Sequence, residues 1–260
     1  MNMSCKKLVN LKTVWIAMVF SLFPPFYELE ALDQGENVAG HTNTAKSILA
    51  AQKPGEWEVL FDGKNTAKWK GVNSNTFPSN GWIIEEEALV LANKGGGDII
   101  TREKYSNFEL ELKFKLTRGA NSGIKYFVSP METKKETKTV MNGPEYQIID
   151  DYNHPEVKDH QHEEGATAAL YLIYPAQNKK LLPEGQWNQA KIIARGKYVE
   201  HWLNGVKVVS YERGNKDFQE RVAATKFKAY INYGEVSSGH ILLTDHGDKV
   251  YFKDIRIKRL

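Results

Sequence analysis

Strict alternation of apolar and charged residues along one segment constrains this chain more than any other feature. Residues Asn107–Thr117 read NFELELKFKLT. A repeat of two residues over this length is the period of a half-buried β-strand and does not fit a helix. We expect the core face of this strand to consist of Phe108, Leu110, Leu112, Phe114 and Leu116. The opposite face would carry Glu109, Glu111, Lys113 and Lys115.

Further short segments have strand-like composition and are separated by turn residues. The first are Trp57–Phe61, Trp82–Glu85, Ala88–Ala92, Asp98–Thr101, Gly123–Val128, Glu145–Ile149 and Ala168–Ile173. The later ones are Ala190–Arg195, Tyr198–Leu203, Val206–Tyr211, His240–Leu243 and Val250–Lys258. Asn204-Gly205 lies between two of them and predicts a tight hairpin.

Only Asp217–Ala224 reads as a helix in the body of the chain. Strands and helices do not alternate, which favours an all-β sandwich or barrel over a doubly wound parallel sheet. A chain of 260 residues fits one such domain preceded by a short leader. We expect a signal peptide at residues 1–31, an arm or linker at 32–54 and the β domain at 55–260.

The N-terminal segment has the pattern of an export signal. Three lysines, Lys6, Lys7 and Lys12, precede an apolar run from Thr13 to Phe23, which Pro24 ends. The run has the length of a signal-peptide core and is too short to span a bilayer as a helix. A membrane anchor or a buried core helix is the alternative to a cleaved signal. We therefore expect a periplasmic or secreted protein, with no stable membrane insertion once the signal is removed.

Charge and cysteine content narrow the classes of function. The net charge is +3, which equals the charge of the three N-terminal lysines. A near-neutral body has no electrostatic footprint for nucleic acid. The one cysteine, Cys5, lies in the leader, so the body has no disulfide, thiolate metal site or cysteine nucleophile.

Two strand-associated segments hold polar residues that a plain sandwich does not need. GANSGIKY contains Asn121 and Ser122 in an expected turn, with Lys125 on the strand that follows. GPEYQIIDD contains Glu145 and Gln147, which share one strand face, while Asp150 has the opposite parity. Turn formation and an exposed polar face are the structural alternatives to a ligand site.

Two loops hold histidines. His154–Glu164 contains His160 and His162, which with Glu163 or Glu164 could hold a divalent metal, although loops of this composition are commonly just solvated. TDHGD contains His246 between an acid and a glycine, where it could carry a proton or belong to a turn.

These segments, in their order along the chain, are similar to those of a known family. The matching pieces are WEVLFDGKN, GGGDIIT, YSNFELELKFKL, GANSGIKY, GPEYQIIDD, ATAALY, GQWNQAKI, HWLNGVKV and DHGDKVYFKDIRIK. From about Gly55 to Leu260 the chain resembles the 3-keto-disaccharide hydrolase family, also described as 3-keto-glucoside 1,2-lyases and hydratases. The resemblance implies a concanavalin-like, jelly-roll antiparallel β-sandwich, often exported, that acts on a small sugar substrate.

The sequence departs from the family pattern at several positions. Ala168 stands where the family often has glycine, Thr244 stands where it often has glutamine, and Lys253-Asp254 replaces an Arg-Asn pair. If the family's glutamine contacts substrate, Thr244 is too short to replace it, and specificity would change.

The implied substrate explains why this chain lacks the acid pair of an ordinary glycosidase. Retaining glycosidases use two carboxylates about 5–5.5 Å apart, but here Gln147 occupies the position of the middle acid. A ketone at C3 acidifies the C2 proton, so proton removal can expel the C1 substituent with one base and one acid. Glu145 or His246 could be the base, and the other of the two, or Asp150, the acid. Asn121, Lys125 or a divalent cation could hold the enolate oxygen.

Two other functions fit the same fold. A non-catalytic, lectin-like module would bind sugar through Tyr171, Trp202 and amides, and a laminarinase-like glycosidase is disfavoured by Gln147. Clustering of Glu145, His246 and Lys125 in one concave pocket would favour the enzyme. The sequence leaves the oligomeric state open.

Overall fold

The computed structural model describes residues 54–134, 139–159 and 163–260. All of these residues belong to one compact unit, Leu49–Leu260. The expected signal peptide at 1–31 and all but the last residue of the expected arm at 32–54 lie outside the described residues. Within the described ranges, no helix combines the length and the apolar character needed to cross a bilayer.

The described residues form two antiparallel sheets, which confirms the predicted concanavalin-like β-sandwich. The larger sheet has eight strands. Seven follow the order β12 (Val206–Glu212), β11 (Tyr198–Leu203), β10 (Asn188–Arg195), β6 (Phe108–Leu116), β14 (Val250–Arg259), β4 (Ala88–Leu91) and β3 (Trp82–Glu85). The eighth, β1 (Trp57–Phe61), pairs with the second half of β14.

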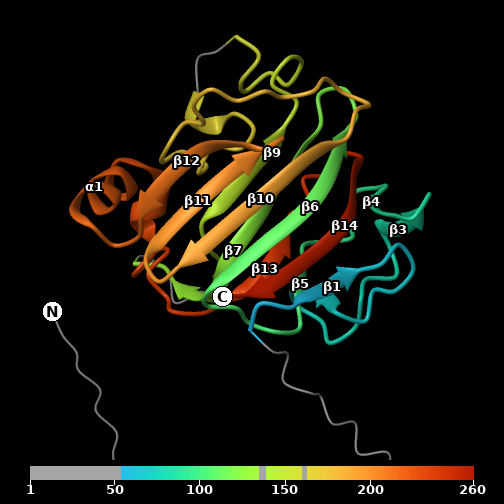
Figure 1. Cartoon of the computed structure of the whole chain (residues 1–260), viewed down its shortest axis with the longest axis horizontal. Helices are drawn as coiled ribbons and strands as arrows, with labels where there is room; N and C mark the ends of the chain where they lie inside the picture. Colours follow the sequence, from blue (N-terminus) through green and yellow to red (C-terminus); the bar gives the residue numbers. More distant parts are fainter. Residues whose placement is uncertain (1–53, 135–138, 160–162) are drawn as a thin grey trace, which may run out of the picture. The chain divides into compact units, whose positions relative to one another are not determined.

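The smaller sheet has six strands and lies behind the larger one in Figure 1. Five follow the order β2 (Trp69–Gly71), β5 (Ile99–Thr101), β13 (His240–Leu243), β7 (Asn121–Glu132) and β8 (Thr139–Asn142). The sixth, β9 (Glu145–Ile149), pairs with the first half of β7. The long strand β7 thus carries two short partners on one edge, and the polar segments of β7 and β9 lie side by side.

The core fills the space between the sheets. All five predicted core residues of β6, Phe108 to Leu116, are at most 5% exposed. On the other face Glu111 forms ion pairs with Lys191 and Arg256, at 2.8 and 2.6 Å. The alternation in the sequence therefore places the strand correctly, with apolar groups inside and paired charges outside.

Most predicted elements are confirmed, including the hairpin at Asn204-Gly205 between β11 and β12 and the helix α1 (Lys216–Ala224). The turn expected at Asn121 and Ser122 is wrong, because both residues belong to β7 and pair with β9. Two short 3₁₀ helices, η1 (Glu163–Gly165) and η2 (Lys226–Ala229), complete the described elements. The short strands β2 and β8 were not predicted from the sequence.

The predicted strand at Ala168–Ile173 is wrong. Ala168 and Leu172 have φ values of +69° and +62°, in the left-handed region that interrupts an extended strand. The segment forms successive turns instead, while Leu170 makes single bridges to Tyr146 and Tyr174. Its apolar residues are buried, so hydrophobic composition alone did not distinguish it from a strand.

Candidate active site

A small cavity of about 160 Å³ lies where β7 and β9 meet a loop after β13 and the η2 helix. Its lining consists of Asn121, Lys125, Asn142, Glu145, Gln147, Tyr171, Lys226, Phe227, Tyr230 and His246. Six of these were candidate site residues from the sequence: Asn121, Lys125, Glu145, Gln147, Tyr171 and His246. The structure thus brings together residues that are up to 125 positions apart in the chain.

The register of β7 against β9 builds the floor of the cavity. Lys125 is directly opposite Glu145, and Gly123 is opposite Gln147. Residues opposite each other in an antiparallel pair point to the same face of the sheet. The two residues Tyr146 and Ile148, of opposite parity, point into the main core. The predicted shared face of Glu145 and Gln147 is therefore confirmed.

Glu145 is a buried carboxylate with little compensation. It is 6% exposed, its Oε1 has no hydrogen-bond partner, and its Oε2 lies 3.9 Å from Lys125 Nζ. Burial raises the pKa of Glu145 because the charged form loses hydration, while the nearby Lys125 and His246 oppose that change. The result is a carboxylate that holds a proton more readily than an exposed glutamate.

His246 reaches the cavity from a loop that side chains hold in place. The carboxylate of Asp245 accepts hydrogen bonds from the backbone N–H groups of Gly97 and Gly247, at 2.7 and 2.8 Å. Asp248 accepts another from the N–H of Asn121, at 3.0 Å, which ties the loop to β7. His246 itself is exposed, so it lies at the mouth of the cavity and Glu145 lies deeper.

An aromatic and cationic wall completes the cavity, and sequence reasoning missed most of it. Phe227 stacks on Tyr233 with ring centroids 4.3 Å apart, which anchors η2. The ammonium group of Lys226 then lies 4.7 Å from the ring centroid of Tyr171. Asn142 and Tyr230 were missed as well. Their positions depend on how irregular loops pack, and no local pattern in the sequence marks them.

Three buried oxygen atoms of the lining residues have no hydrogen-bond partner. They are Asn121 Oδ1, Asn142 Oδ1 and Glu145 Oε1. Buried acceptors are normally paired, because an unpaired one costs roughly 1–3 kcal/mol. Acceptors gathered around one cavity suit a ligand that carries several hydroxyl groups, as a sugar does.

Asp150 and Trp202, also predicted as site residues, are not among the residues that line the cavity. The Asp150 carboxylate accepts hydrogen bonds from Gly119 N, Tyr152 N and Asn153 Nδ2, at 2.7, 3.1 and 2.7 Å. Asp150 therefore holds the turns that flank the end of β9. Trp202 donates from Nε1 to Glu200 at 2.9 Å, on the larger sheet.

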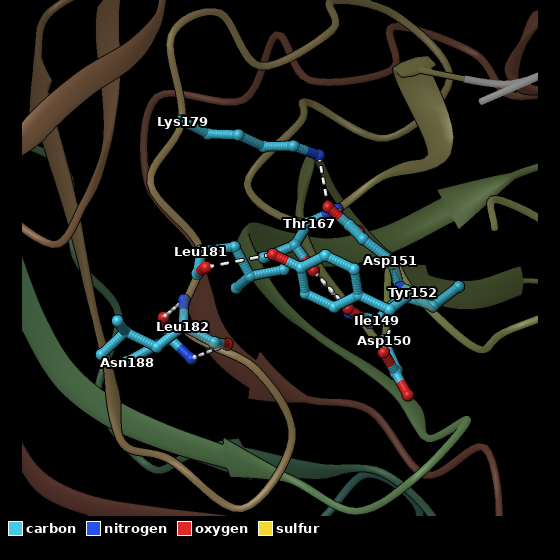
Figure 2. Close-up of polar contacts among 9 residues, drawn as sticks. All are labelled: Ile149, Asp150, Asp151, Tyr152, Thr167, Lys179, Leu181, Leu182 and Asn188. Carbon is cyan, nitrogen blue, oxygen red and sulfur yellow. Dashed lines mark hydrogen bonds and ion pairs between the residues drawn. The ribbon is translucent and has the colours of Figure 1, made fainter. Parts of the chain in front are cut away.

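The loop that follows β9 is fixed by its own set of polar contacts, which Figure 2 shows. Asp151 pairs with Lys179, and the hydroxyl of Tyr152 donates to the carbonyl of Leu181. Thr167 bonds both the N–H and the carbonyl of Ile149. These contacts fix the end of β9, and so the position of the Glu145 segment, from outside the cavity.

The metal candidates His160 and His162 lie outside the described residues. Across the ranges that the structure describes, no three residues among His, Cys, Asp and Glu gather closely enough to hold a metal ion.

Comparison with known proteins identifies the family. The profile described as the 3-keto-alpha-glucoside-1,2-lyase-like domain matches residues 56–258. The chain belongs to this family. A 3-keto-disaccharide hydrolase from Bacteroides thetaiotaomicron is 34% identical to it over 226 residues, 78% of each chain. The resemblance expected from the sequence is therefore confirmed.

Solved structures that are similar to this chain in both sequence and fold come from Parabacteroides distasonis. One protein, provisionally described as a glycosyl hydrolase, is 34% identical with a TM-score of 0.68, over 78% of this chain and 94% of that one. A second of the same description is 27% identical with a TM-score of 0.60, over 79% of this chain and all of that one. In this chain Thr244 is buried beside the cavity floor, where its N–H donates to the carbonyl of Gly123.

Proposed function

We propose that this protein cleaves the glycosidic bond of 3-keto-glycosides, and of 3-keto-disaccharides in particular. The family and the name of the Bacteroides relative support the substrate class. One observation carries the mechanism: among the described residues that line the cavity, Glu145 is the single carboxylate. Hydrolysis by two flanking carboxylates lacks its second partner there, whereas elimination from a keto sugar requires one base.

Glu145 is the base that removes the C2 proton. It lies deep in the cavity with one unpaired oxygen, and burial raises its pKa toward the range where a carboxylate accepts protons efficiently. The electron pair of the C2–H bond moves into C2–C3, and negative charge develops on the C3 oxygen. Lys125, beside Glu145, and Asn121 on the same strand face are placed to stabilise that oxygen.

His246 is the acid that protonates the leaving oxygen. It lies at the exposed mouth of the cavity, and we place the second sugar on that side. As the C1–O bond breaks, the leaving oxygen takes the proton and departs as an alcohol. The product is an enone sugar with a C1–C2 double bond. Addition of water, with hydroxyl to C1 and a proton to C2, then gives the free 3-keto sugar and completes net hydrolysis.

The test compares a disaccharide with its oxidised form. Purified protein incubated with 3-keto-trehalose should release glucose, and unoxidised trehalose should remain intact under the same conditions. Deuterium at C2 should slow the release where proton removal limits the rate. Equal cleavage of both sugars would refute the elimination route. Tight binding of the keto sugar without any release would favour a sugar-binding module instead.

A further inference from the structure

A glycine in the middle of β7 has no backbone reason to be there. Gly123 lies within an extended strand, paired with Gln147, and its φ is outside the left-handed region that favours glycine. Glycine in a strand interior weakens the strand, because it loses more conformational freedom on folding and packs no side chain. Glycine at this position therefore suggests that a neighbouring group needs the space that a side chain would take.

The space beside Gly123 is taken by the Glu145 side chain. A Cβ atom built on Gly123 would lie 2.1 Å from Glu145 Oε1, 2.9 Å from its Cδ and 3.0 Å from its Cγ. The carboxylate therefore lies across the bare backbone of β7. The same Oε1 has no hydrogen-bond partner, and its residue is 6% exposed.

We propose that Gly123 is a positioning residue, which reserves the place where the Glu145 carboxylate must lie to remove the C2 proton. This inference rests on the proposed function for the role of Glu145, but the geometry holds without it. Any side chain at position 123 would push the carboxylate away from β7. A glycine also offers no polar side-chain group to that oxygen, so Glu145 stays poorly solvated and basic.

The decisive variant is Gly123→Ala. A displacement of about 1 Å at a reacting group can cost on the order of 10²-fold in rate, so kcat on 3-keto-trehalose should fall by about that factor, with KM changed less. The displaced carboxylate becomes better hydrated. The acidic limb of the pH–rate profile should therefore move to lower pH.

A matched control is available in the same sheet. Gly71 of β2 also has an ordinary φ, and a Cβ there would find ordinary contacts, the nearest at 3.4 Å from Ser74 Cβ. Gly71→Ala should fold normally and keep kcat within about twofold of wild type.

Shortening the acid tests the coupling directly. Glu145→Asp alone should lower activity, since the carboxylate no longer reaches its place. In the Gly123→Ala background the same change should cost much less or restore activity, because the shorter side chain relieves the clash. Effects that simply multiply, or a Gly123→Ala variant within about threefold of wild type, would overturn the inference. The double variant also decides the matter if Gly123→Ala alone folds poorly.

Carbon NMR titration of Glu145 separates this inference from the proposed function, since it needs no substrate. The Glu145 pKa should be lower in Gly123→Ala than in wild type, and unchanged in Gly71→Ala. Equal Glu145 titrations in all three proteins would overturn the role of Gly123. If the Glu145 pKa falls in Gly123→Ala as expected but the wild-type protein is inert on 3-keto-trehalose, only the proposed function is overturned.

Discussion

At the scale of single residues, Glu145 is a cavity residue whose burial is poorly compensated by hydrogen bonds or ion pairs. Its carboxylate is almost fully buried, one oxygen is unpaired, and its ion pair with Lys125 is long at 3.9 Å. Such an arrangement costs folding free energy whenever the group is ionised. Uncompensated burial of this kind is common where a side chain must react with a ligand. A carboxylate with all its hydrogen bonds and an ion pair in place would be a weak base.

The variant Glu145→Gln should therefore be less active and more stable at neutral pH. Loss of positioned proton transfer should lower kcat by about 10²–10⁴-fold. Because burial raises the folded-state pKa, the acid's contribution to stability is complete below its ordinary pKa of about 4.5 and is lost as pH rises through the folded value. Denaturation in urea should show the glutamine variant ahead at pH 8, with the difference shrinking toward pH 4. A wild type more stable than the variant at pH 8 would contradict this.

The residues of the cavity were only partly predictable, and the reason is physical. Glu145, Gln147 and Lys125 lie on regular strands, where parity fixes the face of each side chain once the strand is recognised. Lys226 lies on a 3₁₀ helix whose place depends on Phe227 stacking against Tyr233. Contacts of that kind join separate segments and leave no periodic trace in the sequence.

At the scale of elements, the alternating strand β6 was predictable and the buried segment Ala168–Ile173 was not. The alternation in β6 identified both its extent and its buried face, because one wrong step in register would place charges in the core. Ala168–Ile173 has equally apolar residues, but two left-handed residues fold it into turns. Its backbone still bonds β9, for instance from Tyr171 N to Glu145 O at 3.0 Å. Local composition therefore located the buried segment and misjudged its conformation.

Truncation of a fully buried aromatic side chain of β6 should test its role in the core. Phe114 is fully buried on a strand held between β10 and β14, so Phe114→Ala should lower the free energy of unfolding by about 3–5 kcal/mol. Its neighbour Lys113 pairs with Asp254 at the exposed surface, at 2.9 Å, and Lys113→Ala should cost less than about 1 kcal/mol. Equal denaturation midpoints for the two variants would mean that the assigned register is wrong.

At the scale of the whole molecule, a buried histidine links the two sheets. His201 of β11 is fully buried, and its Nε2 lies 2.7 Å from the hydroxyl of Tyr126 on β7. Its Nδ1 lies 3.0 Å from the carbonyl of Ala168, which can only accept, so Nδ1 carries the proton and Nε2 accepts from the tyrosine. The hydroxyls of Tyr126 and Tyr211, 2.7 Å apart, extend the network. Burial favours the neutral imidazole, because the charged ring would lose its hydration there, and this lowers the pKa of His201.

This histidine should make the global stability depend on pH. Burial lowers the pKa of His201 to about 4, from an ordinary value of 6.5. Between these pH values His201 is protonated in the unfolded chain and neutral in the folded protein. The free energy of unfolding should therefore fall as pH decreases from 6.5 to 4, by about 3 kcal/mol in total. Urea denaturation at several pH values in this window should show that slope in wild type and a shallower one in His201→Gln, whose side chain does not titrate. The comparison uses the slope, since the variant also loses packing and starts from a lower stability at pH 7.

Glu145 works in the opposite direction, because its raised pKa favours the folded state at low pH. Combining His201→Gln with Glu145→Gln should therefore separate the two contributions. Parallel slopes for wild type and His201→Gln would show that His201 has the same pKa in the folded and unfolded chain, contrary to this prediction.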